Sequence, residues 1–151
     1  MIKKIDETNK QIIRLLKDGR KPYSMIADEL GITENTVRSR VNKLLEEGVL
    51  RIAGMVDPQH VPGLQVIIMG VKLSTMELAK KAEEFLTLRG VVSVAVVTGR
   101  YDLIVKLVLS EEDDLTLLQF FSEELKKVKE VLDVETYVVY QSHELLVPYI
   151  L

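Results

Sequence analysis

The stretch LGITENTVRSRVNKLLEEGVL, residues 30–50, decides the fold of the first part of the chain. Thr33 is a residue type that caps the start of a helix, because its hydroxyl can accept a hydrogen bond from a backbone N–H of the first turn. Gly48 can end the same helix, because glycine readily adopts the left-handed conformation found after helix C-termini. The stretch therefore predicts one helix from Thr33 to Glu47.

Two shorter helices are predicted upstream of this one. Residues 6–17 place their apolar side chains on one stripe, with Asp6 as the N-cap, and residues 21–30 predict a second helix that Gly31 ends. The small Ala27 suits a close crossing with the helix that follows. Three helices, the last two joined by a tight turn, form the helix-turn-helix arrangement.

The helix that begins at Thr33 has two chemically different faces. Its apolar face consists of Val37, Val41, Leu44 and Leu45. Its polar face consists of Asn35, Thr36, Ser39, Asn42 and Lys43, and Thr33 precedes it at the start of the helix. Arg38 and Arg40 lie on the two flanks of this face. The major groove of DNA admits a helix, Asn and Arg pair with base edges there, and cationic side chains contact phosphates. We therefore expect this face to bind DNA.

A simpler interpretation treats the same charges as solvated helix surface. Glu34 with Arg38, and Lys43 with Glu47, have the i,i+4 spacing of helical ion pairs. We favour DNA because the first 51 residues hold eleven Lys and Arg against eight Asp and Glu, a net charge of +3. The remaining residues hold nine against fifteen, a net charge of −6. A basic first part and an acidic second part indicate two units with different partners.

The composition excludes several kinds of site. The 151 residues include no cysteine, which excludes disulfides, thiolate zinc sites and cysteine nucleophiles. His60 and His143 have no metal-ligand spacing, and no nucleophile–base pair or phosphate loop is visible. No apolar run reaches the roughly 18 residues of a membrane span, and the N-terminus lacks the apolar stretch of a signal peptide. We expect a cytoplasmic protein that is not an enzyme, needs no cofactor or metal and does not contact a membrane.

The second part of the chain alternates strand-like and helix-like segments. Apolar runs of strand length predict strands, and apolar residues at helical spacing predict helices. The predicted elements are a strand at 65–73, a helix at 75–88, strands at 91–98 and 102–109, a helix at 111–128 and a strand at 131–141. The acidic residues at 111–114 are expected to form the start of the second helix, where the helix dipole favours them. The order is β-α-β-β-α-β, the ferredoxin-like fold, so the fold class is α+β.

The two parts are expected to be joined by a connecting segment. Residues 49–58 are apolar and β-branched, which predicts one or two strands, and residues 57–63, with two prolines and a glycine, are the linker candidate. The predicted organisation is a helix-turn-helix domain at 1–50, a connecting strand and linker at 51–64, and a ferredoxin-like domain at 65–151.

The turn at residues 98–102 is a second candidate site. Gly99 permits a positive φ and lets backbone N–H groups approach a ligand carboxylate closely. Arg100 could hold a carboxylate and Asp102 an ammonium, which are the two charges of a free amino acid. The alternative is an ordinary hairpin in which Asp102 is a turn residue and Arg100 is solvated.

In these features the sequence resembles the Lrp/AsnC family, the leucine-responsive or feast/famine regulators. The matching segments are the acidic residue before the first helix, IADELGI, TVRSRVNKLLEEGVL and VDP in the first half, and TGRYDLIVKL in the second. The resemblance implies a transcription regulator that binds double-stranded DNA as a homodimer or a higher assembly. It also implies a small-molecule effector, often an amino acid, that tunes the assembly or the DNA affinity.

The resemblance also assigns roles to residues. It places the DNA-reading helix at 33–47. For Arg40 it leaves three possibilities open, namely a contact with a phosphate, with a base or with another residue of the chain. It places the effector where dimers meet, at Gly99, Arg100, Tyr101, Asp102 and Thr136. Many family members carry an acidic residue at the position of Arg100, which leaves the ligand's side-chain type open. The sheet face that bears Tyr137 and Val139 is a candidate for sheet-on-sheet dimerisation. The alternative function is an architectural DNA-compacting protein whose second domain only oligomerises.

Overall fold

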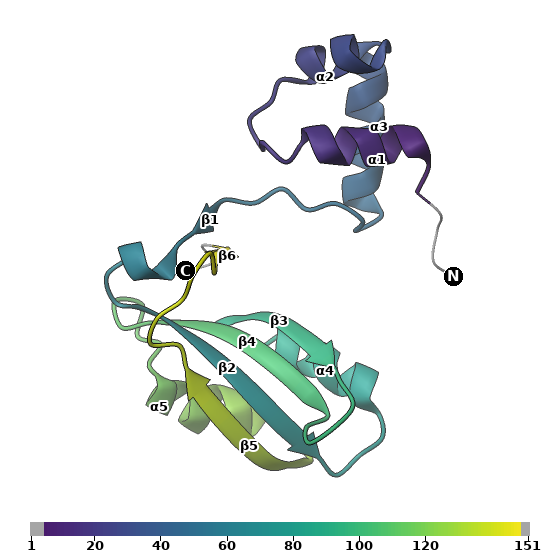
Figure 1. The fold of residues 1–151 in the computed structure, drawn as a ribbon. Coiled ribbons are helices and arrows are strands. Elements are labelled where there is room, and N and C mark those ends of the chain that lie inside the picture. Colours follow the sequence, from purple (N-terminus) through teal and green to yellow (C-terminus); the bar gives the residue numbers. More distant parts are fainter. Residues whose placement is uncertain (1–4, 149–151) are drawn as a thin grey trace. The chain divides into compact units, whose positions relative to one another are not determined.

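In the computed structural model the chain forms two compact units, residues 1–53 and residues 54–151. The structure describes residues 5–148 (Figure 1). The boundary falls inside the connecting segment that the sequence suggested.

The first unit consists of three helices, α1 (Glu7–Leu15), α2 (Tyr23–Leu30) and α3 (Glu34–Glu46) (Figure 1). Their positions confirm the helix-turn-helix prediction. The core cluster of the unit takes residues from all three helices: Ile12, Ile26, Ala27, Val37 and Val41. Leu45 was expected on the apolar face of α3 but is 38% exposed, because it lies at the edge of the stripe that the two other helices cover.

The helix ends follow the capping residues that the sequence indicated. The side chain of Asp6 accepts a hydrogen bond from the backbone N–H of Asn9, and that of Thr33 accepts one from the N–H of Thr36. Gly31 has a φ of 64°, the left-handed conformation that lets the chain turn between α2 and α3. Local signals therefore set the start of α3, which is the helix expected to read DNA.

The second unit is built on a four-stranded antiparallel sheet in the order β3-β4-β2-β5. Its strands are β2 (Leu64–Leu73), β3 (Val91–Val96), β4 (Leu103–Ser110) and β5 (Val131–Val138). The helix α4 (Leu78–Leu86) and the helical segment that starts with α5 (Leu117–Gln119) cover one face of the sheet (Figure 1). This arrangement confirms the predicted β-α-β-β-α-β order.

Alternate residues of the two central strands face the helices. They form the main core with Phe85 and Phe120: Ile67, Met69, Val71, Leu103, Val105 and Leu107. At one end of the opposite face of the sheet, Val66 and Val108 pack against Val147. Ile68, Ile104 and Lys106 lie on the rest of that face and are half-buried.

The helix predicted at 111–128 begins later than expected and is irregular. Residues 111–114 form a turn, stabilised by a hydrogen bond from the Ser110 hydroxyl to Asp113, so the acidic residues do not start the helix. Thr116 is the N-cap, with a capping box to Gln119. After α5 the chain continues as a π-helical turn (Phe120–Glu124) and a 3₁₀ turn (Leu125–Lys127). The predicted start of this helix was wrong, because Asp, which occupies positions 113 and 114, also favours turns.

The segment that precedes the sheet belongs to the second unit. The short strand β1 (Met55–Val56) pairs with β6 (Val147–Pro148), a strand that the sequence did not indicate. The predicted linker instead contains a 3₁₀ turn (Pro58–His60), and the Gln59 amide donates a hydrogen bond to the Ser142 carbonyl. Residues 49–54 form no strand. None of the helices within residues 5–148 is long and apolar enough to cross a membrane.

Candidate nucleic-acid interface and effector site

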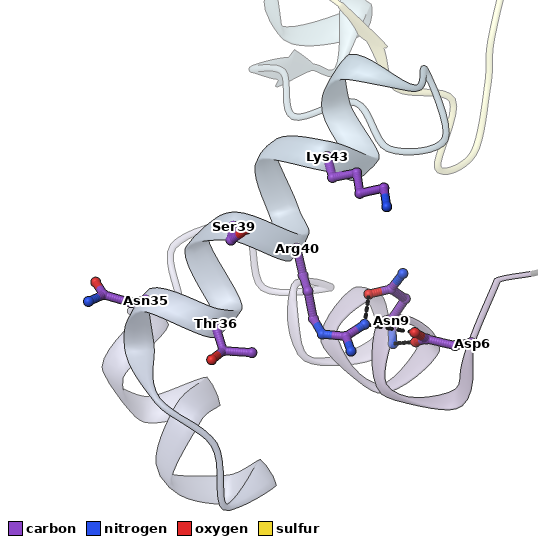
Figure 2. Close-up of a pocket in the computed structure, with 7 residues that line it drawn as sticks. All are labelled: Asp6, Asn9, Asn35, Thr36, Ser39, Arg40 and Lys43. Atoms are coloured by element: carbon purple, nitrogen blue, oxygen red, sulfur yellow. Dashed lines mark hydrogen bonds and ion pairs between the residues drawn. The ribbon is translucent and has the colours of Figure 1, made fainter.

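The exposed face of α3 borders two open hollows. The first, of about 570 Å³, lies between α3 and the start of α1 (Figure 2) and is lined by Asp6, Asn9, Asn35, Thr36, Ser39, Arg40 and Lys43. The second, of about 700 Å³, lies on the other side of the same face and is lined by Asn35, Arg38, Ser39, Asn42, Lys43, Glu46 and Glu47. The structure thus brings the predicted DNA-binding side chains of α3 onto one accessible surface.

Arg38 forms the ion pair that the simpler interpretation expected. Its Nη2 lies 2.7 Å from Oε1 of Glu34, and its guanidinium lies 5.4 Å from the centre of the Tyr23 ring. The side chain remains 57% exposed, so it can still reach a phosphate or a base after exchanging its partner. An exposed ion pair of this kind contributes little to stability, so replacing Glu34 with DNA as the partner of Arg38 costs little free energy.

Arg40 has an intramolecular role, one of those that the sequence left open. Its Nη1 donates to Oδ2 of Asp6 at 2.8 Å and to Oδ1 of Asn9 at 2.9 Å. The hydrogen bond from Arg40, followed by that from the Asn9 backbone, lowers the pKa of the Asp6 carboxyl below its usual range. Arg40 therefore ties α3 to the first turn of α1.

The two threonines at the start of α3 are partly committed to the helix itself. The hydroxyl of Thr33 caps α3 and lies 2.8 Å from the hydroxyl of Thr36. Asn35, Ser39 and Asn42 have spacings that place them on one helix face, and all three are exposed. These three residues and Lys43 are the strongest candidates for contacts with DNA.

In the second unit, Asp102 is already paired within the chain. Its carboxylate accepts a hydrogen bond from Nζ of Lys72 at 2.8 Å and one from the backbone N–H of Leu73 at 2.9 Å. The Lys72 bond, then the Leu73 bond, lower the pKa of Asp102. The ammonium that Asp102 was expected to bind is thus supplied by Lys72, and this pair joins the start of β4 to the end of β2.

The neighbouring Tyr101 and Arg100 reach across the sheet toward β5. The Tyr101 ring lies over Gly70, where an added Cβ would come within 2.6 Å of the ring. Its hydroxyl is 3.4 Å from that of Tyr137, and Nη2 of Arg100 is 3.4 Å from Oε2 of Glu135. A hydrogen bond to Glu135 and then burial raise the pKa of Tyr137.

The sequence did not single out Gly70 or Glu135 for this site. A glycine inside an apolar strand signals the close approach of another group, and Glu135 shares a strand face with Tyr137. Thr136 lies on the opposite face, because it pairs with Met69, which is buried under the helices. The structure therefore brings Arg100 and Tyr101 together with Glu135 and Tyr137, and does not bring Thr136 to the same surface.

Two family models match the two units. The AsnC-type helix-turn-helix domain matches residues 5–45, and the Lrp/AsnC ligand binding domain matches residues 66–144. An uncharacterised HTH-type transcriptional regulator of Pyrococcus abyssi is 31% identical over 134 residues, which cover 87% of this chain and 84% of the relative.

Solved structures show the same fold. The crystal structure of PH0061 matches with a TM-score of 0.78 and 24% identity, over 97% of this chain and 99% of that chain. The regulator NMB0573 of Neisseria meningitidis, solved as a complex with L-Met, matches with a TM-score of 0.66 and 17% identity, over 91% of each chain. The chain belongs to the Lrp/AsnC family of DNA-binding transcription regulators, which are not enzymes, and consists of an AsnC-type helix-turn-helix domain and a ligand-binding domain.

Proposed function

We propose that the protein is an amino-acid-responsive transcription regulator that reads the DNA major groove with α3. The observation that carries the proposal is the division of α3 into two faces. Val37 and Val41 are fully buried, whereas Asn35, Ser39 and Asn42 are exposed on the other side. Amide and hydroxyl side chains can recognise base edges, and Lys43 beside them can contact a phosphate.

We infer that the working form is a homodimer that can build larger assemblies. An antiparallel sheet with helices on one face leaves the other face to cover. Ile68 and Ile104 lie on that face and are only half-buried in the single chain. Packing two such faces together would give a two-fold dimer, whose paired α3 helices suit two half-sites of pseudo-palindromic DNA.

For the effector we propose a free amino acid bound at the turn of residues 99–102. Gly99, with a φ of 132°, shapes a turn that presents backbone N–H groups, and the Arg100 side chain is 75% exposed. Both could hold a carboxylate. The complex of NMB0573 with L-Met supports an amino acid as the class of ligand.

The proposed partner of the ligand's ammonium is Glu135 and no longer Asp102. In the single chain the cation beside Oε2 of Glu135 is Arg100, whose Nη2 lies 3.4 Å away. If the exposed Arg100 side chain turns to the ligand carboxylate, Glu135 loses this cation, and the ligand ammonium would take its place. Tyr101 and Tyr137 beside it would contact the ligand's side chain.

Calorimetric titration of the full-length protein with each of the twenty amino acids tests the effector. We expect at least one to bind with a dissociation constant below about 1 mM, roughly −4 kcal/mol, and to change the mobility of a protein–DNA complex. Glu135→Gln should abolish that binding, whereas Glu111→Gln, the same change at an exposed turn, should leave it intact. If no amino acid binds, the effector proposal falls and the architectural alternative takes its place. If Glu135→Gln binds normally, the ammonium lies elsewhere.

A further inference from the structure

Asn9 lies on α1, outside the helix that the family resemblance assigns to DNA, yet it lines the same hollow as Lys43 (Figure 2). Its side chain is held at one end, because Oδ1 accepts a hydrogen bond from Nη1 of Arg40 at 2.9 Å. Its backbone N–H donates to Oδ1 of Asp6 at 2.7 Å. Asn9 is thus fixed in position by groups that lie within the first unit.

The bond from Arg40 also decides which way the Asn9 amide faces. A guanidinium only donates, so the amide atom next to it has to be the oxygen, and the nitrogen with its two N–H donors points away from Arg40. Figure 2 shows this nitrogen on the side of the hollow toward the Lys43 ammonium. Within residues 5–148 no hydrogen bond from the Asn9 side-chain nitrogen is found; the two bonds of this residue involve its Oδ1 and its backbone N–H.

The remaining groups of the hollow favour an anion. Asp6 is the acidic residue that lines it, and its carboxylate is already matched by Arg40 and by the Asn9 backbone. The amide nitrogen of Asn9, the hydroxyl of Ser39 and the ammonium of Lys43 are then donors that face the same space. Amides, hydroxyls and lysines are among the groups that bind DNA phosphates.

We propose that this hollow binds one phosphate of the DNA backbone, held between Asn9 on α1 and Lys43 on α3. The inference rests on the proposed function, in which α3 lies in the major groove, because the phosphate would belong to the strand that borders that groove. Arg40 acts as a positioning residue that orients the Asn9 amide and holds α1 against α3. The contact would set the register of α3 on DNA without reading sequence.

Matched variants of the full-length protein separate this contact from a structural role. Asn9→Asp keeps an oxygen for Arg40 but replaces the donor nitrogen with an acceptor that repels phosphate. We expect Asn9→Asp to weaken binding about ten-fold or more, a loss of roughly 1.4 kcal/mol, equally on a selected operator and on an unrelated duplex. Its melting temperature should match that of the wild type. Gln11→Ala, an exposed change two residues further along α1, should bind both duplexes normally.

Salt dependence distinguishes the two partners of the phosphate. Lys43→Ala should reduce the slope of log affinity against log salt by about 0.9, because one ionic contact is lost. Asn9→Ala removes a neutral donor and should weaken binding without changing the slope. A lower slope for Asn9→Ala, matching that of Lys43→Ala, would contradict the proposed division of roles.

Replacing single phosphates with neutral methylphosphonates identifies the group itself. We expect one position at which the replacement costs the wild type about ten-fold, roughly 1.4 kcal/mol, and costs Asn9→Ala less, because one of the two groups that hold the phosphate is already gone. The proposal is overturned if Asn9→Asp binds both duplexes as the wild type does, or if every replacement affects the two proteins equally. Failure of the proposed function differs from both, because Asn42→Ala would then leave the base preference of the protein unchanged.

Discussion

Asp6 and Asp102 show how single charged residues join distant parts of each unit. Each carboxylate accepts one hydrogen bond from a cation and one from a backbone N–H. The cation is Arg40 for Asp6 and Lys72 for Asp102, and in both cases its hydrogen bond is the largest cause of a lowered pKa. These two carboxylates, which could bind a ligand, instead form contacts within the chain that stabilise the fold. Binding of a ligand is therefore expected from neighbouring residues.

The lowered pKa of Asp6 predicts a pH-dependent contribution to stability. Because the folded unit binds this proton less readily than the unfolded chain, the contribution is present above the ordinary pKa of 3.8 and is lost as pH falls through the folded value. Asp6→Asn keeps an N-cap residue but removes the charge. We expect its melting temperature to lie below that of the wild type at neutral pH and to converge with it in acid, as circular dichroism across this range would show. A difference that does not vary with pH would contradict the role of the charge.

Substitutions of neutral and of charged residues on α3 should affect DNA binding differently. Asn42→Ala should cost roughly 1–3 kcal/mol on the best operator and relax the preference at one base pair. Lys43→Ala should weaken binding to all sequences alike. Selection from a random library, followed by affinity measurements on matched and mismatched duplexes, compares the two variants. An unchanged preference in Asn42→Ala would exclude a base contact by that residue.

Among the elements, α3 depends on a cap at its first turn. The Thr33 side chain accepts a hydrogen bond from the N–H of Thr36 at 3.2 Å, and Val37 and Val41 then bury one face of the helix. The same turn presents Asn35 on the exposed side. The stability of the helix and its presentation of side chains to DNA therefore begin at the same residue.

Removing this cap should have a measurable cost. We expect Thr33→Ala to lower the free energy of unfolding of the first unit by about 1 kcal/mol, whereas Thr33→Ser keeps the hydroxyl and should cost little. Urea unfolding followed by circular dichroism compares the two variants. Equal losses in both would show that the methyl group of Thr33, and not its hydrogen bond, stabilises α3.

In the molecule as a whole, the second unit is closed by strand pairing between the first and last parts of residues 54–148. The pairing of β1 with β6 brings residues 55–56 beside residues 147–148. Val147 is fully buried against Val66 and Val108, so these ends cover part of the sheet face that the helices leave open. The unit is therefore larger than the ferredoxin-like core of residues 65–151.

Two fragments test this boundary. We expect residues 54–151 to fold, to associate in sedimentation at micromolar concentration and to melt at a higher temperature than residues 65–151, which lack β1. Val147→Asp within the longer fragment should lower its stability, because a charge would be buried without a partner. A monomeric 54–151 fragment would remove the dimer proposal, and equal melting temperatures of the two fragments would show that β1 adds no stability.

Local chemistry was enough to predict the helix-turn-helix and the order β-α-β-β-α-β. The caps at Asp6 and Thr33, the turn glycine Gly31 and the apolar runs of strand length all concern neighbours in sequence, so they can be recognised without coordinates. The exposed polar face of α3 followed from the same helical spacing. Residues 111–114 show the limit of such signals, since acidic residues suit a turn and a helix start alike.

Contacts between residues far apart in sequence were decided only by the tertiary structure. Arg40 is separated from Asp6 by 34 positions and Lys72 from Asp102 by 30, and nothing local to either member identifies its partner. The same holds for Tyr101 over Gly70, for Glu135 beside Arg100 and for the pairing of β1 with β6. A capping or spacing rule concerns a few adjacent residues, whereas the partner of a charge or of an edge strand depends on how the whole unit packs.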